Sequence, residues 1–459
     1  MFDPAYKNMK DVDPALYKLI AAENIRQNEF VELVASESYV SVPVLQASAS
    51  LLHNSYGKGK IDENVGNRGN VVNKIEDLCR ERALRFFNLD KNVWGVNVRP
   101  YSGTVANFEI YNALLGQKGR LMGMDLFCGG HFSHGFKTEQ RTVSASSEYF
   151  ESCFYGLKDD GRIDYEKMRK DFVKNKVQLL IGGASAYPGD FDYKRMREIA
   201  DQNNAYLMAD ISHVSAMIAC GMMNNPFEYC DIAITTVQKM LRGPKAAIVY
   251  YRKNKNGVDI ENLINQSISP GFQKSIHYQT VAGIAAALKL TQAGEYKAFV
   301  AQVLKNMQSM CKIFRENGMQ LLTGGTVNHL AMLDMRSIEF KGRVLTLDAA
   351  LFEWICNFVN ISVNKNPWPG DTSALHPSGV RVSTVSITIR GFKEKECAQV
   401  ALFLVNIVER VGNFELTNVD EIKKRVKDDK WFTELRNKII ELAKPYPVPG
   451  LNLFCRMNC

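Results

Sequence analysis

The middle of the chain alternates between short apolar runs and segments of helical or loop character, and this alternation restricts the folds open to it. The apolar runs are VWGVNV, RLMGM, VQLLIGG, AYLMAD, DIAITT and AAIVYY. The segment YKRMREIADQNN, directly before AYLMAD, has the spacing of a crossover helix. Strands that alternate with helices indicate a mostly parallel sheet covered on both faces. The sequence therefore predicts an α/β fold class.

The chain divides into three expected parts. We predict an N-terminal helical arm over residues 1–50, a large α/β domain over 51–290 and a smaller C-terminal α+β domain over 291–459. A helix is expected through ALYKLIAAENIRQNEFVELV, and the polar, Gly-rich stretch 54–70 is expected to be an exposed loop. A second helix should bury the face formed by Ile75, Leu78, Cys79, Ala83 and Phe86. After Pro270 the pattern changes to helical periodicity over 281–317, followed by the strands HLAMLDM and NISVN and three helical stretches.

Composition excludes several classes of protein. The 459 residues can bury a sizeable core. Lys and Arg number 57 against 49 Asp and Glu, and the net charge of +8 is spread too thinly to indicate a nucleic-acid partner. No apolar run reaches the roughly 18 residues of a membrane span. Ten cysteines without CxxC spacing indicate reduced thiols and no metal site. The first residues, MFDPAYKNMKDVDP, do not resemble a presequence, so a cytoplasmic location is expected and a mitochondrial one stays open.

Polar residues follow several of the predicted strands, where ligands bind in α/β sheets. Ser102, Gly103 and Thr104 come between VWGVNV and a helix, which suits a phosphate at a helix N-terminus but also suits a simple capped turn. His131 follows two glycines after RLMGMDLFC. It could stack on a flat ring, or be a histidine of the core.

Two charged residues stand at the ends of consecutive strands. Asp210 ends AYLMAD, where a carboxylate can pair with a protonated ring nitrogen, bind a metal or cap the next helix. Lys239 follows DIAITTVQ; it is either a surface lysine or a buried one that must be paired or shifted in pKa. A phosphate cup, a stacking histidine, an aspartate and then a lysine together meet the requirements of pyridoxal 5′-phosphate (PLP), in which the lysine forms a Schiff base and the aspartate keeps the ring nitrogen protonated.

With these residues, the chain resembles the serine hydroxymethyltransferase family over nearly its full length. The matching strings are LVASES, WGVNVRPYSGTVANF, GGHFSHGF, AYLMADISHVSA, TTVQKMLRGPK, VNKN, SGVRVST and ITIRGFKEKE. The resemblance implies a PLP-dependent transferase of fold type I, with a mostly parallel sheet in the large domain. The family reaction moves the hydroxymethyl carbon of serine to tetrahydrofolate and leaves glycine.

The resemblance also implies roles for individual residues. Lys239 matches the Schiff-base lysine, His131 the ring-stacking histidine and Asp210 the partner of the ring nitrogen. Arg381 matches the arginine that pairs with the amino-acid carboxylate, a task suited to a bidentate guanidinium. The remaining cofactor contacts are Ser102, Gly103, Thr104, Ser185, His213 and Thr236; Asn366 matches a folate-side residue, and Tyr56 a retained catalytic tyrosine.

Departures from the family pattern concentrate where protons are moved. The family glutamate aligns with Lys58, a pair of tyrosines aligns with Val65 and Gly66, and a further tyrosine aligns with Lys60. An ammonium cannot replace a carboxylate as the same acid or base. Elsewhere, the histidine before the lysine is Gln238, the neighbouring threonine is Val237, the element GGPH reads KSIH from Lys274, and GTPA reads STVS from Ser383.

Two interpretations follow from these departures. The first is a catalytically impaired or inactive relative that serves as a structural or binding subunit and still holds PLP. The second is a working hydroxymethyltransferase, or a PLP enzyme that cleaves aldol substrates without folate. Lys58 and Lys60 belong either to a solvated surface turn or to a remodelled basic patch for a partner or an anion. Both predict a homo-oligomer, or a subunit of a larger assembly, since family active sites lie at a subunit interface.

Overall fold

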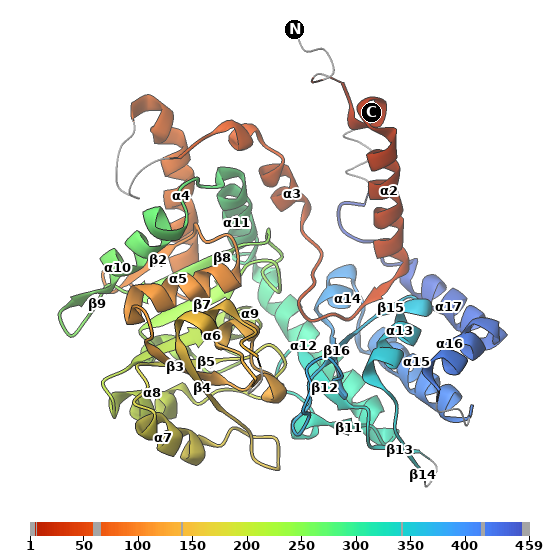
Figure 1. Ribbon diagram of the computed structural model, residues 1–459. Coiled ribbons are helices and arrows are strands. Elements are labelled where there is room, and N and C mark those ends of the chain that lie inside the picture. Colours follow the sequence, from red (N-terminus) through yellow and green to blue (C-terminus); the bar gives the residue numbers. More distant parts are fainter. Residues whose placement is uncertain are drawn as a thin grey trace.

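A seven-stranded sheet forms the centre of the larger lobe of the computed structural model (Figure 1). The strands are β2 (Trp94–Asn97), β3 (Arg120–Met124), β4 (Glu151–Tyr155), β5 (Leu179–Gly183), β6 (Tyr206–Asp210), β7 (Ile232–Thr236) and β8 (Ala247–Arg252), in the order β2-β8-β7-β6-β5-β3-β4. The pairs from β7 through β4 are parallel, and β8 is antiparallel to both of its neighbours. The predicted α/β class with a mostly parallel sheet is confirmed. The structure describes residues 5, 7–57, 66–138, 141–340, 343–414 and 418–451.

Helices cover both faces of this sheet, which explains why its strands read as continuous apolar runs. Leu179 and Ile181 of β5 pack against one face and Leu180 against the other. The helices of the larger lobe are α4 (Gly66–Phe86), α5 (Gly103–Leu115), α6 (Ala145–Tyr149), α7 (Tyr165–Lys174), α8 (Tyr193–Asp201), α9 (Ser215–Ala219), α10 (Ile260–Gln266) and α11 (Tyr278–Leu290). Short turns η3 (Leu126–Cys128), η4 (Phe132–His134), η5 (Pro226–Glu228) and η6 (Ser267–Phe272) and the hairpin of β9 (Asn254–Lys255) with β10 (Val258–Asp259) complete it.

A second hydrophobic core lies in the smaller lobe, which contains a four-stranded antiparallel sheet in the order β11-β12-β17-β16. These strands are β11 (Gln320–Leu321), β12 (Leu330–Asp334), β16 (Asn364–Asn366) and β17 (Gly379–Ser383), with β13 (Ile338–Phe340), β14 (Arg343–Leu345), β15 (Ile361–Ser362) and the turn η7 (Leu322–Gly324) beside them. Its helices are α12 (Gly294–Glu316), α13 (Ala349–Phe358), α14 (Val385–Arg390), α15 (Glu394–Gly412), α16 (Val419–Asp428) and α17 (Lys430–Ala443). Residues of α12 pack into both cores, so the domain boundary near residue 290 stays a prediction.

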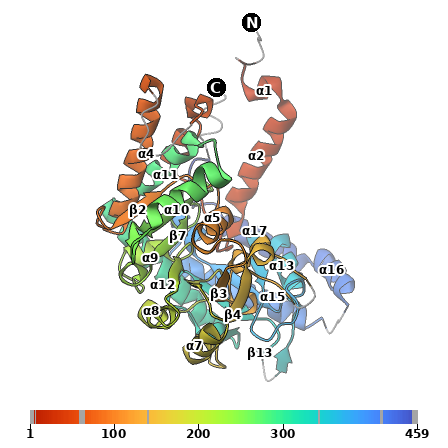
Figure 2. The ribbon, with the colours of Figure 1, turned by 60° about the vertical axis from the view of Figure 1, so that its left-hand side comes forward.

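The first part of the chain forms α1 (Met9–Val12), α2 (Pro14–Glu29), β1 (Val31–Glu32), α3 (Val42–Ser48) and η2 (Leu51–Asn54), and Val44 of α3 packs into the core of the larger lobe, so a separate arm over 1–50 stays a prediction. Neither α1 nor α2 buries a residue, and α2 projects away from the lobes in both views (Figure 2). The expected helix through residue 34 is wrong at its end, because residues 31 and 32 form a strand that pairs with β15. The expected loop over 54–70 is also wrong at its end, because α4 begins at Gly66.

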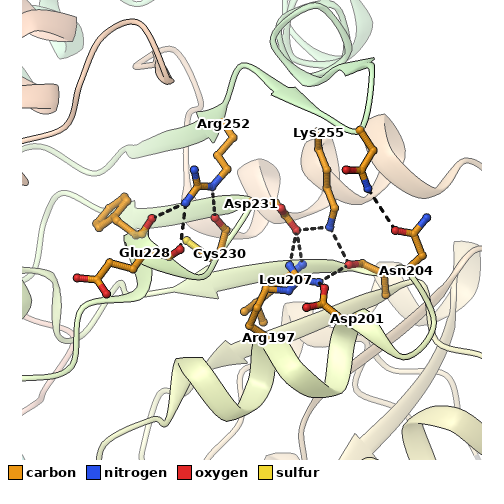
Figure 3. A network of polar contacts seen from close by, with 12 residues as sticks. Arg197, Asp201, Asn204, Leu207, Glu228, Cys230, Asp231, Arg252 and Lys255 are labelled. Carbon is orange, nitrogen blue, oxygen red and sulfur yellow. Dashed lines mark hydrogen bonds and ion pairs between the residues drawn. The ribbon is translucent and has the colours of Figure 1, made fainter.

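A cluster of charges ties together the end of the sheet at which β6 and β7 begin (Figure 3). The Oδ2 atom of Asp231 accepts hydrogen bonds from Arg197 at 2.9 Å, from Lys255 at 2.7 Å and from the backbone N of Leu207 at 2.8 Å. The cluster therefore joins α8, β6, the start of β7 and β9. It lies at the opposite end of the strands from the carboxyl ends, which leaves those ends open for a site.

Candidate active site

A cavity of about 480 Å³ lies beyond the carboxyl ends of the central strands, between the two lobes. Each of the following predicted residues lines it: Ser102, Gly103, Thr104, His131, Ser185, Asp210, His213, Thr236, Lys239, Asn366 and Arg381. They arrive from the segments after β2, β3, β5, β6 and β7 and from β16 and β17 of the smaller lobe. The structure thus brings together residues that are far apart in the sequence.

Asp210 ends β6 and is held by several donors. Its Oδ2 lies 3.1 Å from both Nε2 of His134 and Nδ2 of Asn107, and its Oδ1 accepts from the backbone N of Ser212 at 3.2 Å. Burial by itself raises the pKa of Asp210. The hydrogen bond from His134 and its charge lower the pKa by more than burial raises it, so the net pKa lies well below the usual range of an aspartate. The carboxylate is therefore ionised and can face a protonated ring nitrogen.

Lys239 follows β7 and is buried. Burial lowers its pKa from 10.5 to about 8, while the charge of Asp210 partly opposes the shift. The surface-lysine alternative is therefore wrong. With such a pKa the amine is still mostly protonated at pH 7, but its neutral fraction is far larger than that of an ordinary lysine, and the neutral form can act as a nucleophile.

The segment from Ser102 forms the start of α5. The Oγ of Ser102 is the N-cap acceptor for the backbone N of Val105, at 3.4 Å, so the capped turn exists in the structure. A Cβ at Gly103 would lie 2.7 Å from Cγ2 of Thr236, so only glycine fits between the two segments. The cup therefore combines a helix N-terminus with the hydroxyls of Ser102, Thr104 and Thr236.

Two histidines, His131 and His213, line the cavity. His131 lines it and has its Nδ1 2.6 Å from the hydroxyl of Ser133. His213 is buried and stacks on His329, with ring centroids 5.5 Å apart. Burial lowers the pKa of His131 to about 4 and the pKa of His213 well below its ordinary value. Both imidazoles are therefore neutral at pH 7.

Arg381 reaches the cavity from β17 of the smaller lobe. Its Nη1 donates to the carbonyl oxygen of Ser185 at 2.7 Å, and its Nε and Nη2 donate to Oδ1 of Asn364 at 3.2 and 3.1 Å. Burial lowers the pKa of Arg381 to about 10, which still leaves it charged at pH 7. Asn364 also donates to the side chain of Asn366, so one amide links the two predicted substrate residues.

Several predicted features lie elsewhere. Tyr56 is 62% exposed and is not among the residues that line this cavity, so its catalytic role stays a prediction. Lys58, Lys60 and Val65 lie outside the described residues. Gly66 begins α4, and the side chains of residues 66–70 are not described. Of the described residues that line the cavity, Asp210 is the one carboxylate.

The other departures from the family pattern fall on folded segments. Gln238 lines the cavity, and its Oε1 is buried without a hydrogen-bond partner among the described residues. Val237 points instead into the core. In the segment that starts at Lys274, the ring of His277 stacks on Tyr101 at a centroid distance of 4.2 Å. The segment therefore packs against the residue that precedes the phosphate cup.

The cavity fits PLP in its chemistry as well as its size. Among the described residues, Oγ1 of Thr236, Nδ1 of His213 and Oδ1 of Asn107 are buried without a partner. Such atoms are costly unless a ligand or water satisfies them. An anion at the ring-nitrogen end, a nucleophilic amine and a cup of hydroxyl groups are the donor set that PLP needs.

Sequence reasoning missed the residues that hold the site residues in place. These are Asn107, His134, Ser212, His329 and Asn364, and Ser36 is a further lining residue that it missed. His134 and Ser36 lie inside the matching strings GGHFSHGF and LVASES, so their positions carried a usable signal. Across the described ranges, no group of His, Cys, Asp or Glu is arranged to hold a metal ion, and no helix is both long and apolar enough to cross a membrane.

Comparisons with known proteins find similarity to serine hydroxymethyltransferases. A family model described as serine hydroxymethyltransferase matches residues 9–404. A cytosolic serine hydroxymethyltransferase of Encephalitozoon cuniculi is 42% identical over 448 residues, which covers 95% of this chain and 96% of that protein. A serine hydroxymethyltransferase of Bombyx mori is 38% identical, with 97% and 98% covered. A mitochondrial serine hydroxymethyltransferase of Schizosaccharomyces pombe is 38% identical, with 95% and 90% covered.

Proposed function

The chain belongs to the serine hydroxymethyltransferase family, and from this premise we propose that it binds PLP and an amino acid but is impaired in hydroxymethyl transfer to tetrahydrofolate. Family members depend on PLP and have the type I fold. One observation carries the proposal: the cavity keeps Lys239, Asp210 and Arg381, while Lys58 stands at the position of the family glutamate. The residues for binding PLP and an amino acid are therefore present, whereas the carboxylate for proton transfer is replaced by a lysine.

The residues of the cavity divide the work of binding. When bound, PLP supplies an electron sink for the substrate carbon. Lys239 would hold the cofactor through its amine, and Asp210 would keep the ring nitrogen protonated. Ser102, Thr104 and the α5 N-terminus would bind the phosphate. Arg381 would orient a serine or glycine through its carboxylate.

The proposed impairment follows from charge at position 58. A carboxylate accepts and returns protons near neutral pH, whereas a lysine ammonium carries a proton and repels cationic groups. General acid–base help is worth about 10²–10⁴-fold in rate. The described lining residues offer no second carboxylate as a substitute for it. A structural or binding role in an assembly would then explain why the cavity is kept.

A second candidate function is a working hydroxymethyltransferase, or folate-independent aldol cleavage. The observation that favours it is the completeness of the amino-acid side of the cavity, where Arg381 is fixed by Ser185 and Asn364. Aldol cleavage would need a base for the substrate hydroxyl. His131, which burial keeps neutral, lines the same cavity and is the candidate for that task.

We also propose that the protein is a homo-oligomer or part of a larger assembly. Leu51 is 83% exposed and Tyr56 is 62% exposed, and the apolar residues Leu16, Leu19 and Ile25 of α2 are exposed as well. Apolar surface of this kind is typical of an interface. Light scattering on the purified chain tests the proposal, and a strict monomer at micromolar concentration contradicts it.

A titration with PLP followed by a turnover assay tests the function. We expect a visible absorption band that Lys239→Ala abolishes, together with little or no conversion of serine and tetrahydrofolate. Lys58→Glu should raise the transfer rate, and Lys91→Glu, another lysine-to-glutamate change, is the control. A coloured protein with the turnover of an active relative overturns the impairment, and a colourless protein overturns PLP binding.

The compartment is part of the proposal. Relatives carry the names cytosolic, mitochondrial and chloroplastic. We propose a cytoplasmic location, and cell fractionation with an antibody against the chain tests it. Recovery with mitochondria would contradict the proposal.

A further inference from the structure

A second and larger cleft, of about 870 Å³, lies between the lobes and away from Lys239. One wall is formed by the loop 158–165 and the loop 187–195 of the larger lobe, and the other wall by the end of α12 and the turn 323–327 of the smaller lobe. None of its lining residues belongs to the cavity described above. Its volume suits a small polar molecule rather than a single ion.

Four cations line this cleft: Lys158, Arg162, Arg195 and Arg315. Arg162 is 80% exposed and lies 3.9 Å from Asp160, a distance too long for a strong ion pair. Nη1 of Arg315 donates to the carbonyl oxygen of Gly324 at 3.1 Å, and no carboxylate pairs with Arg315 within the described residues. No ion pair of Lys158 occurs within the described part of the chain. Arg195 is paired with Glu166 and lies over the ring of Tyr165, so the donor capacity available to a ligand is mainly that of Lys158, Arg162 and Arg315.

The three carboxylates of the cleft are occupied by the protein's own backbone. Asp190 accepts from the backbone N of Phe191 and of Asn224, at 2.8 and 2.9 Å. Asp192 is the N-cap of α8, and Asp160 accepts from the backbone N of Arg162 at 2.9 Å. These hydrogen bonds leave the carboxylates charged but occupy the accepting oxygens, so the open donors of the cleft, among the described residues, are mainly the side-chain N–H groups of Lys158, Arg162 and Arg315.

The turn opposite Lys158, Arg162 and Arg195 has an unusual backbone. Thr323, Gly324 and Gly325 have φ values of 60°, 71° and 156° in succession. A β-branched residue at positive φ is strained, and a turn of this kind can present backbone N–H groups to an anion, although the backbone N of Gly325 itself donates to the carbonyl oxygen of Leu322 at 3.3 Å. The hydroxyls of Thr323 and Thr326 lie in the same wall, but they donate to the carbonyl oxygens of Leu322 and Pro188, at 2.6 and 3.2 Å.

The cleft is connected to Arg381 through both walls. The backbone N of Val327 donates to the carbonyl oxygen of Pro188 at 3.1 Å, three residues after Ser185, the acceptor of Arg381. A small apolar cluster that includes Ala186, Leu322 and Met332 separates the cleft from the cavity. Met332 is the strand partner of Arg381 in β12 and β17. A molecule that changes the spacing of these walls would therefore change the position of Arg381.

We propose that this cleft binds a phosphate monoester of a small polar molecule and that its occupancy changes the affinity of the cavity for an amino acid. Guanidinium and ammonium groups, together with backbone N–H groups, are the donors that phosphate prefers. The coupling is reciprocal, so an amino acid bound at Arg381 changes the affinity for phosphate by the same factor. Binding in the cleft is independent of the proposed function, whereas the coupling depends on it.

Calorimetric titration of the PLP-loaded protein tests the binding, with inorganic phosphate and glycerol 1-phosphate as probes and potassium chloride at matched ionic strength as the blank. Loading with PLP fills the other phosphate site. We expect one site, and affinity weakened about tenfold or more in Lys158→Gln/Arg162→Gln, because two charge-assisted donors are lost. The exposed Lys170 lies outside the cleft, so Lys170→Gln should bind as the parent does.

The possible results distinguish failure of binding in the cleft, failure of the coupling and failure of the proposed function. Absence of binding to the parent, or equal binding to the double variant, overturns the proposal. If the protein does not retain PLP, the same pair is compared in PLP-free protein, where the difference between parent and variant measures the cleft alone. The apparent affinity for serine is then measured with and without glycerol 1-phosphate. Unchanged affinity overturns the coupling, whereas a failure of serine to bind at all overturns the proposed function and leaves the calorimetric result standing.

Discussion

The Nε2 atom of His134 lies 3.1 Å from Oδ2 of Asp210, and both side chains are buried. This contact fixes the carboxylate that would face the ring nitrogen of PLP. Removing the partner leaves a buried carboxylate with one donor fewer, at a cost of about 1–3 kcal/mol. We expect His134→Leu to lower the free energy of unfolding by that amount and to weaken PLP binding. Urea denaturation and a PLP titration measure the two effects.

His134→Gln is the matched variant, because its amide can still donate to the carboxylate. It should recover most of the stability and of the PLP affinity. If both variants bind PLP as tightly as the parent, His134 does not position Asp210.

Lys239 makes the stability of the PLP-free protein depend on pH. Its folded-state pKa of about 8 lies below the unfolded value of 10.5, so the unfolded chain binds more protons between these values. Stability therefore rises with pH across this window, and below pH 8 the buried ammonium costs about 3 kcal/mol. Lys239→Leu should be more stable than the parent at pH 7, and the gain should shrink as the pH approaches 10. A gain that is constant with pH in urea denaturation contradicts the assignment.

Glu109 of α5 should show the opposite sign. Its side chain is fully buried, neither carboxylate oxygen has a partner among the described residues, and burial raises its pKa from 4.5 to about 8. The unfolded chain releases this proton near pH 4.5, so stability falls as the pH rises from 4.5 to 8. The advantage of Glu109→Gln over the parent should grow by about 2–5 kcal/mol between pH 5 and 8. Denaturant unfolding at both pH values measures it, with the exposed Glu81→Gln as the control.

Much of the candidate site could be predicted because strand ends are visible in the sequence. Asp210 and Lys239 follow apolar runs that are buried on both faces, and such runs are easy to recognise. The contact of His134 with Asp210 spans 76 residues, and local periodicity carries no information about it. β4 escaped prediction because its sequence, ESCFY, mixes exposed, polar and aromatic residues. The end of α2 was misplaced because β1 pairs with a strand of the distant smaller lobe.

Asp231 should be important for stability at the far end of the sheet (Figure 3). Asp231→Asn would leave Lys255 without its ion-pair partner and Arg197 with the exposed Asp201 alone, and the side chains of Arg197 and Lys255 are only 16% and 15% exposed. We expect a loss of about 2–4 kcal/mol, because breaking a largely buried ion pair strands the remaining charge. The exposed pair of Lys167 and Asp171 provides the control, since Lys167→Gln should cost less than about 0.5 kcal/mol. Equal losses in thermal or urea unfolding would show that burial does not distinguish the two pairs.

Asn364 should affect the amino acid rather than the cofactor. Its Oδ1 accepts from Nε and Nη2 of Arg381, so it fixes the plane of the guanidinium without belonging to the PLP cup. In Asn364→Ala the guanidinium can rotate, and we expect the apparent Kd of serine to rise about tenfold, as for the loss of one charge-assisted hydrogen bond. The Kd of PLP should stay the same. The serine-induced change in the visible spectrum measures the first and a PLP titration the second, and Arg381→Ala marks the full loss. An Asn364→Ala protein that loses PLP and serine together would show that the residue supports the fold of the cavity instead.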